Sequence, residues 1–135
     1  MVQPGFLSAS LAVAVGGAVG SWLRFVAGRV WLQAIGPAAA GAFPWATLSV
    51  NVAGSFAMGL LAGWLPRLGG GGESWRLLIG VGLLGGFTTF SAFSLELAAL
   101  IERGEPGLAA LYLFASLSAG LAGLFAGLIM IRSLA

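Results

Sequence analysis

The chain has 135 residues, of which 59% are hydrophobic and 7% are charged. Soluble domains carry about 25% charged residues, so lipid must be the main solvent of this chain. Cys, His and Asp are absent, which excludes disulfides, thiolate or imidazole metal sites and Ser-His-Asp catalysis. Six arginines outnumber four glutamates, but they are scattered singly, unlike the clustered cations of nucleic-acid-binding proteins. We expect an integral membrane protein that is no enzyme and binds no nucleic acid.

Two membrane spans are predicted in the first half of the chain, because a helix of about 20 apolar residues crosses the hydrocarbon core. The first covers residues 6–28. Residues 30–41 are expected to form a connection, since Gly36 followed by proline breaks a helix. The second span covers residues 44–65 and opens with a proline, which suits a first helical turn.

Two further spans are predicted over residues 75–101 and 107–131. The charged, glycine- and proline-containing segment 102–106 is the turn between them. All five tryptophans fall near predicted span ends, as expected for membrane interfaces. The predicted fold class is therefore all-α, with one polytopic four-helix transmembrane domain over residues 1–135.

The arginines are almost evenly divided between the two predicted sides of the membrane. They are Arg67, Arg76 and Arg132 on one side, and Arg24, Arg29 and Arg103 at the other. The positive-inside bias that orients membrane proteins is therefore nearly absent. This balance suggests the hypothesis that the chain inserts in both orientations and that two copies pair antiparallel.

Polar side chains inside the second span are candidates for function, since such groups are costly in lipid. Thr47, Asn51 and Ser55 are spaced four residues apart and share one helical face. Hydrogen bonding between helices is the structural alternative. For Ser55 the two interpretations are balanced, whereas the amide of Asn51 at mid-span favours function.

The third span contains two glycines and two threonines in a row, Gly85-Gly86 and Thr88-Thr89, which is poor helical sequence. A helix break here would free backbone carbonyls that could coordinate a cation. A close-packed continuous helix is the alternative. Phe90 and its neighbour three residues later place two rings on one face, although phenylalanines in membrane helices usually pack or face lipid.

Polar groups of the other spans have two interpretations each. Gly16, Gly20, Arg24 and Gly28 follow one another at four-residue spacing, which predicts a small-residue packing face. Arg24 either extends to the interface or pairs with Glu96, the only acid within a predicted span. Ser116 in the fourth span is either a pore hydroxyl or a packing contact.

Three motifs together resemble the Fluc (CrcB) family of fluoride channels. They are GAVGSWLR at 17–24, TLSVNVAGS at 47–55 and GGFTTFSAFSLE at 85–96. The resemblance covers the whole chain in motif order and loop length. It implies a passive fluoride exporter of the bacterial inner membrane that assembles as an antiparallel, dual-topology homodimer. It also implies two narrow pores and a central structural Na⁺.

The resemblance also assigns roles to residues of the second and third spans. Asn51 matches the pore asparagine whose amide meets fluoride, and Phe90 and Phe93 match the rings that line the ion path. Gly85 and Thr88 match the break residues whose carbonyls hold Na⁺ at the dimer interface.

Further positions match the family less closely. Arg24 matches an arginine near the pore mouth. The positions that match pore hydroxyls are Thr47, Ser91 and Ser116. Two departures concern hydroxyls, because Ala92 stands where the family motif has Ser or Thr and Gly120 stands where a second serine is expected. The polar track along the pore is therefore expected to be thinner or differently placed.

Two other classes of function stay open from the residues alone. A small proton-coupled multidrug transporter also has four helices, but it needs a membrane-embedded carboxylate, typically in the first span. The first span here has no acid, and Glu96 lies away from the span centre. A structural membrane subunit is the second alternative, although such a subunit has no need for the polar break in the third span.

Overall fold

The computed structural model describes residues 4–134, so residues 1–3 and 135 of the predicted domain lie outside the description. Within this range all regular secondary structure is helical, which confirms the predicted all-α class. In chain order the elements are α1 (Phe6–Ala42), α2 (Trp45–Trp64), the 3₁₀ segment η1 (Leu65–Gly71), α3 (Gly72–Trp75), the π-helical segment η2 (Arg76–Leu84), α4 (Gly85–Phe87), α5 (Phe90–Glu102) and α6 (Pro106–Ser133).

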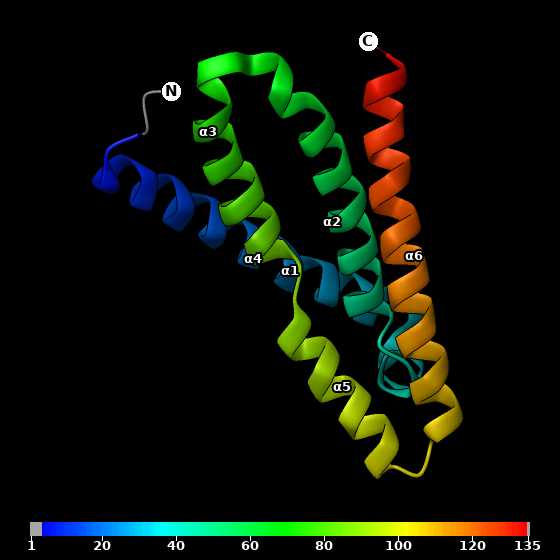
Figure 1. The fold of residues 1–135 in the computed structure, drawn as a ribbon. Coiled ribbons are helices and arrows are strands. Elements are labelled where there is room, and N and C mark those ends of the chain that lie inside the picture. The colour runs from blue at the N-terminus through cyan, green and yellow to red at the C-terminus, as the bar shows by residue number, and fades with distance from the viewer. Residues whose placement is uncertain (1–3, 135) are drawn as a thin grey trace.

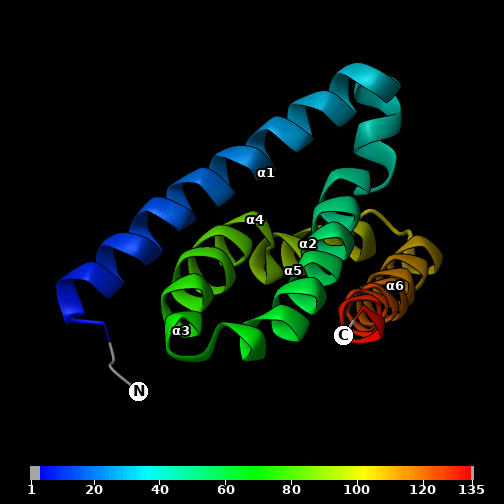
Figure 2. The same ribbon diagram turned by 90° about the horizontal axis from the view of Figure 1, so that it is seen from above.

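The helices form long arms, namely α1, α2, the run from α3 to α5 and α6 (Figure 1). The run from α3 to α5 is called the third arm below. Helices α2 and α6 pack along each other, and α1 crosses η2 and α4. Seen from above, α1 lies along one side of the molecule and α6 lies beyond α2 on the other (Figure 2). The α1–α2 connection and the α5–α6 turn meet at one end of the bundle, so residues far apart in sequence become neighbours there.

Three helical stretches of the described chain are long and apolar enough to cross a membrane: Phe6–Ala42, Trp45–Glu102 and Pro106–Ser133. The second stretch reverses direction at η1, so α2 and the α3–α5 arm run antiparallel (Figure 1). The chain therefore has the form of a multi-pass membrane protein.

The predicted connection over residues 30–41 is largely helical, so that prediction was wrong except at one position. Only Gly36 leaves helical geometry, with φ 76° and ψ 163°. Glycine adopts positive φ without a Cβ penalty, and Pro37 then occupies a first-turn position that suits proline. The alanine-rich residues that follow favour helix, which explains why the chain resumes it.

Paired tryptophans mark the two ends of α2. Trp31 stacks on Trp45 at one end with ring centroids 6.0 Å apart, and Trp64 meets Trp75 edge-on at the other, also at 6.0 Å. The 20 residues of α2 span about 30 Å at about 1.5 Å per residue, which equals the thickness of the hydrocarbon core. The indole pairs therefore lie where an interfacial aromatic belt is expected.

Glycines set the closest contacts between helices. Gly16 and Gly20 of α1 are buried, and a Cβ atom on Gly20 would overlap the carbonyl oxygen of Leu83 in η2. On the other side of the molecule, a Cβ atom on Gly59 of α2 would overlap the carbonyl oxygen of Leu124 in α6. The predicted small-residue packing face of α1 is therefore confirmed at Gly16 and Gly20, which hold α1 against η2 and α4, but not at Gly28, where nothing lies within 4 Å of a Cβ atom.

Candidate functional site

The third arm is broken between α4 and α5, as the sequence predicted. Thr88 and Thr89 are extended, with ψ angles of 161° and 125°. The Thr88 hydroxyl donates to the carbonyl oxygen of Leu84 at 2.8 Å, and the Thr89 hydroxyl accepts from the backbone N–H of Ala92 at 3.1 Å. Thr89 is thus the N-cap of α5. The two threonines end one helix and begin the next.

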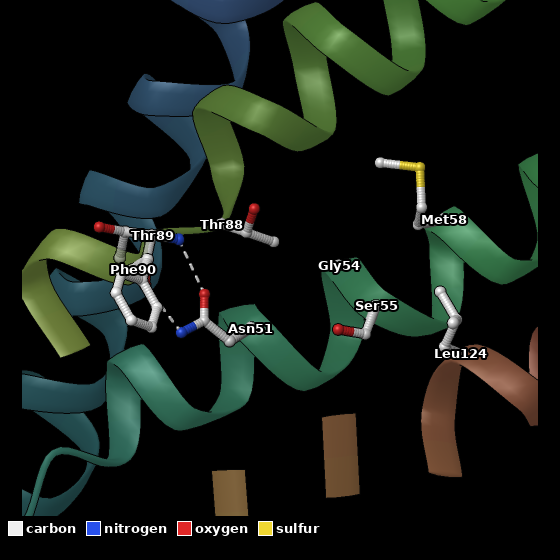
Figure 3. Close-up of a pocket in the computed structure, with 8 residues that line it drawn as sticks. All are labelled: Asn51, Gly54, Ser55, Met58, Thr88, Thr89, Phe90 and Leu124. Carbon is white, nitrogen blue, oxygen red and sulfur yellow. Dashed lines mark hydrogen bonds between the residues drawn. The ribbon is translucent and has the colours of Figure 1, made fainter. Parts of the chain in front are cut away.

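Asn51 of α2 holds the break through both ends of its side-chain amide (Figure 3). Its Nδ2 donates to the carbonyl oxygen of Thr89 at 3.0 Å, and its Oδ1 accepts from the Thr89 backbone N–H at 2.8 Å. In a continuous helix this N–H would bond to the carbonyl oxygen of Gly85. Asn51 therefore takes that bond away from Gly85, while a second N–H on its own Nδ2 remains.

Arg24 of α1 reaches the same break. Its Nη1 donates a long hydrogen bond, of 3.4 Å, to the carbonyl oxygen of Thr88. The alternative in which Arg24 pairs with Glu96 was wrong: among residues 4–134, the one ion pair within 4.0 Å joins Arg76 to Glu73. Glu96 instead has partners on α2 and α6.

The carboxylate of Glu96 accepts two hydrogen bonds from other helices. Thr47 Oγ1 donates to Oε1 at 2.7 Å, and the Tyr112 hydroxyl donates to Oε2 at 2.7 Å. Tyr112 is completely buried. Hydrogen bonds to a charged acceptor are stronger than neutral ones, so this group ties α2, α5 and α6 together. Sequence reasoning missed the role of Tyr112, although it is the single tyrosine of the chain and lies within an apolar span.

Phe90 and Phe93 lie at 5.8 Å between ring centroids, which fits their predicted common face. Their surroundings differ, because Phe90 is 79% exposed and Phe93 is 7% exposed. Phe93 in turn contacts the ring of Tyr112 at 5.0 Å between centroids. The three rings lead from the open surface of the break to the half-buried carboxylate of Glu96.

An open pocket of about 290 Å³ lies between α2, α6 and the break. Its lining residues are Asn51, Gly54, Ser55, Met58, Thr88, Thr89, Phe90 and Leu124. Figure 3 shows Asn51 and Ser55 on successive turns of α2 beside the two threonines. The pocket therefore combines amide and hydroxyl groups with an aromatic ring, and none of its lining residues is charged.

The hydroxyl groups at the predicted pore positions differ in their hydrogen-bond partners. The Ser91 hydroxyl lies 3.3 Å from that of Thr89, and the only proton of the Thr47 hydroxyl is donated to Glu96. The buried Ser116 hydroxyl has no hydrogen-bond partner among the described residues. A Cβ atom on Gly120 would lie 3.6 Å from the Ser55 hydroxyl, so Ser55 faces the position where a second α6 serine was expected.

The arrangement offers a neutral hydrogen-bond donor, the Asn51 amide, within a track of polar groups and aromatic rings between helices. Asn51 and Thr47 lie one turn apart on α2, and Phe90, Phe93 and Glu96 follow one another at three-residue spacing on α5. Donors of this kind can replace part of the water around a small anion without the strong binding of a cationic side chain. Among residues 4–134, no group of three or more Asp, Glu, His or Cys could hold a metal ion.

The fold and the site define a multi-pass helical membrane protein whose third arm is broken at a polar, donor-lined pocket. Residues 11–128 match the family model of the CrcB-like proteins, described as "Camphor Resistance (CrcB)". The chain belongs to this family. It is 57% identical to a protein of Novosphingobium aromaticivorans over 129 residues, which cover 96% of this chain and 100% of that protein.

Two other relatives are similarly close. A protein of Sphingopyxis alaskensis is 54% identical over 90% of this chain and 94% of its own length. A protein of Erythrobacter litoralis is 52% identical over 93% of each chain. All three relatives carry the name "Fluoride-specific ion channel FluC".

Proposed function

We propose that this chain is a fluoride-selective ion channel of the bacterial inner membrane, which exports fluoride passively from the cytoplasm. The observation that carries the proposal is the uncharged, donor-lined pocket at the helix break, in a chain 57% identical to a protein named as a fluoride-specific channel. Such a channel protects the cell because fluoride leaves down its electrochemical gradient.

The chemistry of the pocket suits a small, strongly hydrated anion. A pore must replace the water of the ion with other donors and still release it. Asn51 contributes the Nδ2 proton that the Thr89 carbonyl does not use. Phe90 and Phe93 contribute ring edges, which carry partial positive charge. A narrow path lined by these groups disfavours the larger chloride ion.

Two of the hydroxyl groups can donate to the ion, whereas the third donates to a protein carboxylate instead. Ser116 is free to donate to the ion, because its buried hydroxyl has no partner in the described chain. Ser91 shares its hydroxyl with Thr89 and can turn toward the ion. Thr47 acts through Glu96, since the Thr47 proton is already committed to that carboxylate.

The functional unit in this proposal is an antiparallel homodimer surrounded by lipid. The pocket opens on the surface of the single chain, and Phe90 beside it is 79% exposed. Lipid tails cannot satisfy the amide and hydroxyl groups of the pocket, whereas a second copy can cover them. The even division of arginines between the two sides supports opposite orientations of the two copies.

A structural Na⁺ at the centre of this dimer is part of the same proposal. The carbonyl oxygen of Gly85 has lost its helical donor to Asn51, and the extended Thr88 breaks the helical pattern at its own carbonyl. Two such oxygens from each copy would give four neutral ligands, a donor set that suits Na⁺. The Thr88 oxygen already lies 3.4 Å from the Arg24 guanidinium. It would therefore either contact both the ion and Arg24 or lose its contact with Arg24. When bound, the ion would fix the break in place.

Fluoride efflux from liposomes tests the proposed function. Purified protein is reconstituted into vesicles loaded with fluoride or chloride, and release is followed with ion-selective electrodes. Rapid fluoride release with little chloride release is expected. Fluoride release no faster than from protein-free vesicles, by protein that elutes as a single folded species, contradicts the proposal.

A further inference from the structure

A second cavity, of about 140 Å³, lies at the end of the bundle where the α1–α2 connection meets α5. Its lining includes Glu96 and Leu100 of α5, Arg103 directly after that helix, and Phe43 and Pro44 of the connection. The carboxylate that Thr47 and Tyr112 hold therefore borders a cavity that opens toward the end of the molecule. Through Tyr112, which also contacts the ring of Phe93, Glu96 thus links this cavity to the aromatic residues that follow the helix break.

Arg103 lines this cavity and donates hydrogen bonds to the α1–α2 connection. Its Nη1 donates to the carbonyl oxygen of Gly41 at 2.7 Å, and its Nη2 lies 3.3 Å from that of Ala42. Both acceptors are neutral, and within residues 4–134 no carboxylate lies within 4.0 Å of this guanidinium. Arg103 also lines an adjoining cavity with Glu105. Its positive charge is therefore exposed to whatever occupies these two cavities.

The other charged residues that line these two cavities or adjoin Arg103 in the chain are negative. Glu102 and Glu105 flank Arg103 in the turn, and Glu96 lies seven residues earlier on the same face of α5, or about 10 Å along the helix axis. An anion in these two cavities meets the carboxylates of Glu96 and Glu105 and one cation, with Glu102 next to that cation in the chain. Without the cation, the local potential would repel it.

We propose that Arg103 is the group that admits fluoride at this mouth of the conduction path, by offsetting the carboxylates of Glu96, Glu102 and Glu105. The inference rests on the proposed channel function. It assigns Arg103 an electrostatic role in addition to its contacts with Gly41 and Ala42.

The position of Arg103 suits an ion mouth. The Phe43 ring at the cavity wall contacts Trp45 at 4.7 Å between centroids, and Trp45 belongs to the indole pair at this end of α2. This level corresponds to the membrane interface. A cation in contact with water concentrates anions without holding them, in contrast to a cation buried at mid-membrane.

A purely structural role for Arg103, as a clamp on the end of α1, predicts different behaviour. A clamp depends on hydrogen-bond donors, whereas the proposed mouth depends on the sign of the charge. The chain contains no cysteine, so Arg103→Cys gives a single thiol that can carry either charge. One methanethiosulfonate reagent adds a trimethylammonium group, and another of similar size adds a sulfonate.

The experiment measures initial fluoride efflux from liposomes for labelled and unlabelled R103C at about 0.01 M and about 1 M ionic strength, where the Debye length is about 30 Å and about 3 Å. At the lower strength we expect unlabelled R103C to release fluoride about threefold more slowly than the unsubstituted protein. The cationic label should restore the rate, the anionic label should lower it further, and high salt should reduce these differences. Arg29→Cys is the matched control, because Arg29 is an exposed arginine that lines neither cavity.

Equal rates for the cationic and anionic labels overturn the electrostatic role, whether those rates are fast or slow. The same sensitivity in R29C also overturns it, because the effect would then be general surface charge. If R103C does not fold, Arg103→Lys and Arg103→Gln repeat the comparison, and equal rates in these two variants contradict the proposal. Absence of fluoride efflux from the unsubstituted protein overturns the channel function itself, so the two failures are distinguishable.

Discussion

Replacing Asn51 by alanine removes both contacts that hold the broken helix. The backbone N–H and carbonyl oxygen of Thr89 then lose partners at 2.8 and 3.0 Å. Leaving a buried polar group unpaired costs about 1–3 kcal/mol, so the break is destabilised by about 2–6 kcal/mol. The fluoride ion also loses one amide donor. A hydrogen bond to a charged group contributes about 1.5–3 kcal/mol, so we expect the transport rate to fall about 10- to 100-fold.

Two measurements separate these effects, namely fluoride efflux from liposomes and the thermal unfolding midpoint in detergent. Asn51→Ala should lower both. Asn51→Asp keeps an oxygen that accepts from the Thr89 N–H but loses the amide donor, so it should be more stable than the alanine variant and still conduct poorly. Ser49→Ala is the control, because Ser49 lies two residues away on α2 and bonds to Trp31 outside the pocket. Efflux by folded Asn51→Ala within about twofold of the unsubstituted protein would refute this account.

Three further substitutions test other parts of the structure. Phe90→Ile should slow fluoride efflux about tenfold with an unchanged elution volume in gel filtration, because the ring is 79% exposed and supports no core; normal efflux contradicts an ion-lining role. Tyr112→Phe removes the 2.7 Å bond to Glu96 and should destabilise the protein by about 1.5–3 kcal/mol in a denaturant titration, and an unchanged midpoint would show that this bond contributes nothing. Gly20→Val should prevent recovery of monodisperse protein because its Cβ meets backbone, whereas Gly28→Ala should be tolerated, since nothing lies within 4 Å of a Cβ atom there; equal recovery of the two variants contradicts the packing argument.

Much of the fold could be predicted from local signals in the sequence. The turn before Pro106 and the break at Thr88 and Thr89 follow from residue types whose backbone preferences are strong. The helical course of residues 30–41 could not be predicted, because the decision between a loop and a kink at Gly36 depends on its neighbours. The π-helical turns of η2 were also missed, since their packing against Gly16 and Gly20 is a property of the assembled fold.

The candidate site was predictable where one residue type implied one kind of chemistry. Asn51 stood out as an amide in an apolar span, but its two bonds to the Thr89 backbone depend on the meeting of α2 with the break. Of the two alternatives for Arg24, pairing with Glu96 was wrong, because the structure satisfies that carboxylate with neutral hydroxyls. Spacing along one helix could not reveal these contacts between different helices.

The central claim is that fluoride crosses this protein passively and selectively. Current through planar bilayers that contain the purified protein, recorded with fluoride on both sides at a tenfold gradient and with chloride as the competing anion, tests it most directly. We expect a reversal potential that follows the fluoride gradient, about 59 mV per tenfold ratio, and that does not shift when the chloride ratio is changed. Current that follows chloride or protons, or no current from protein that elutes as a single folded species, would contradict it.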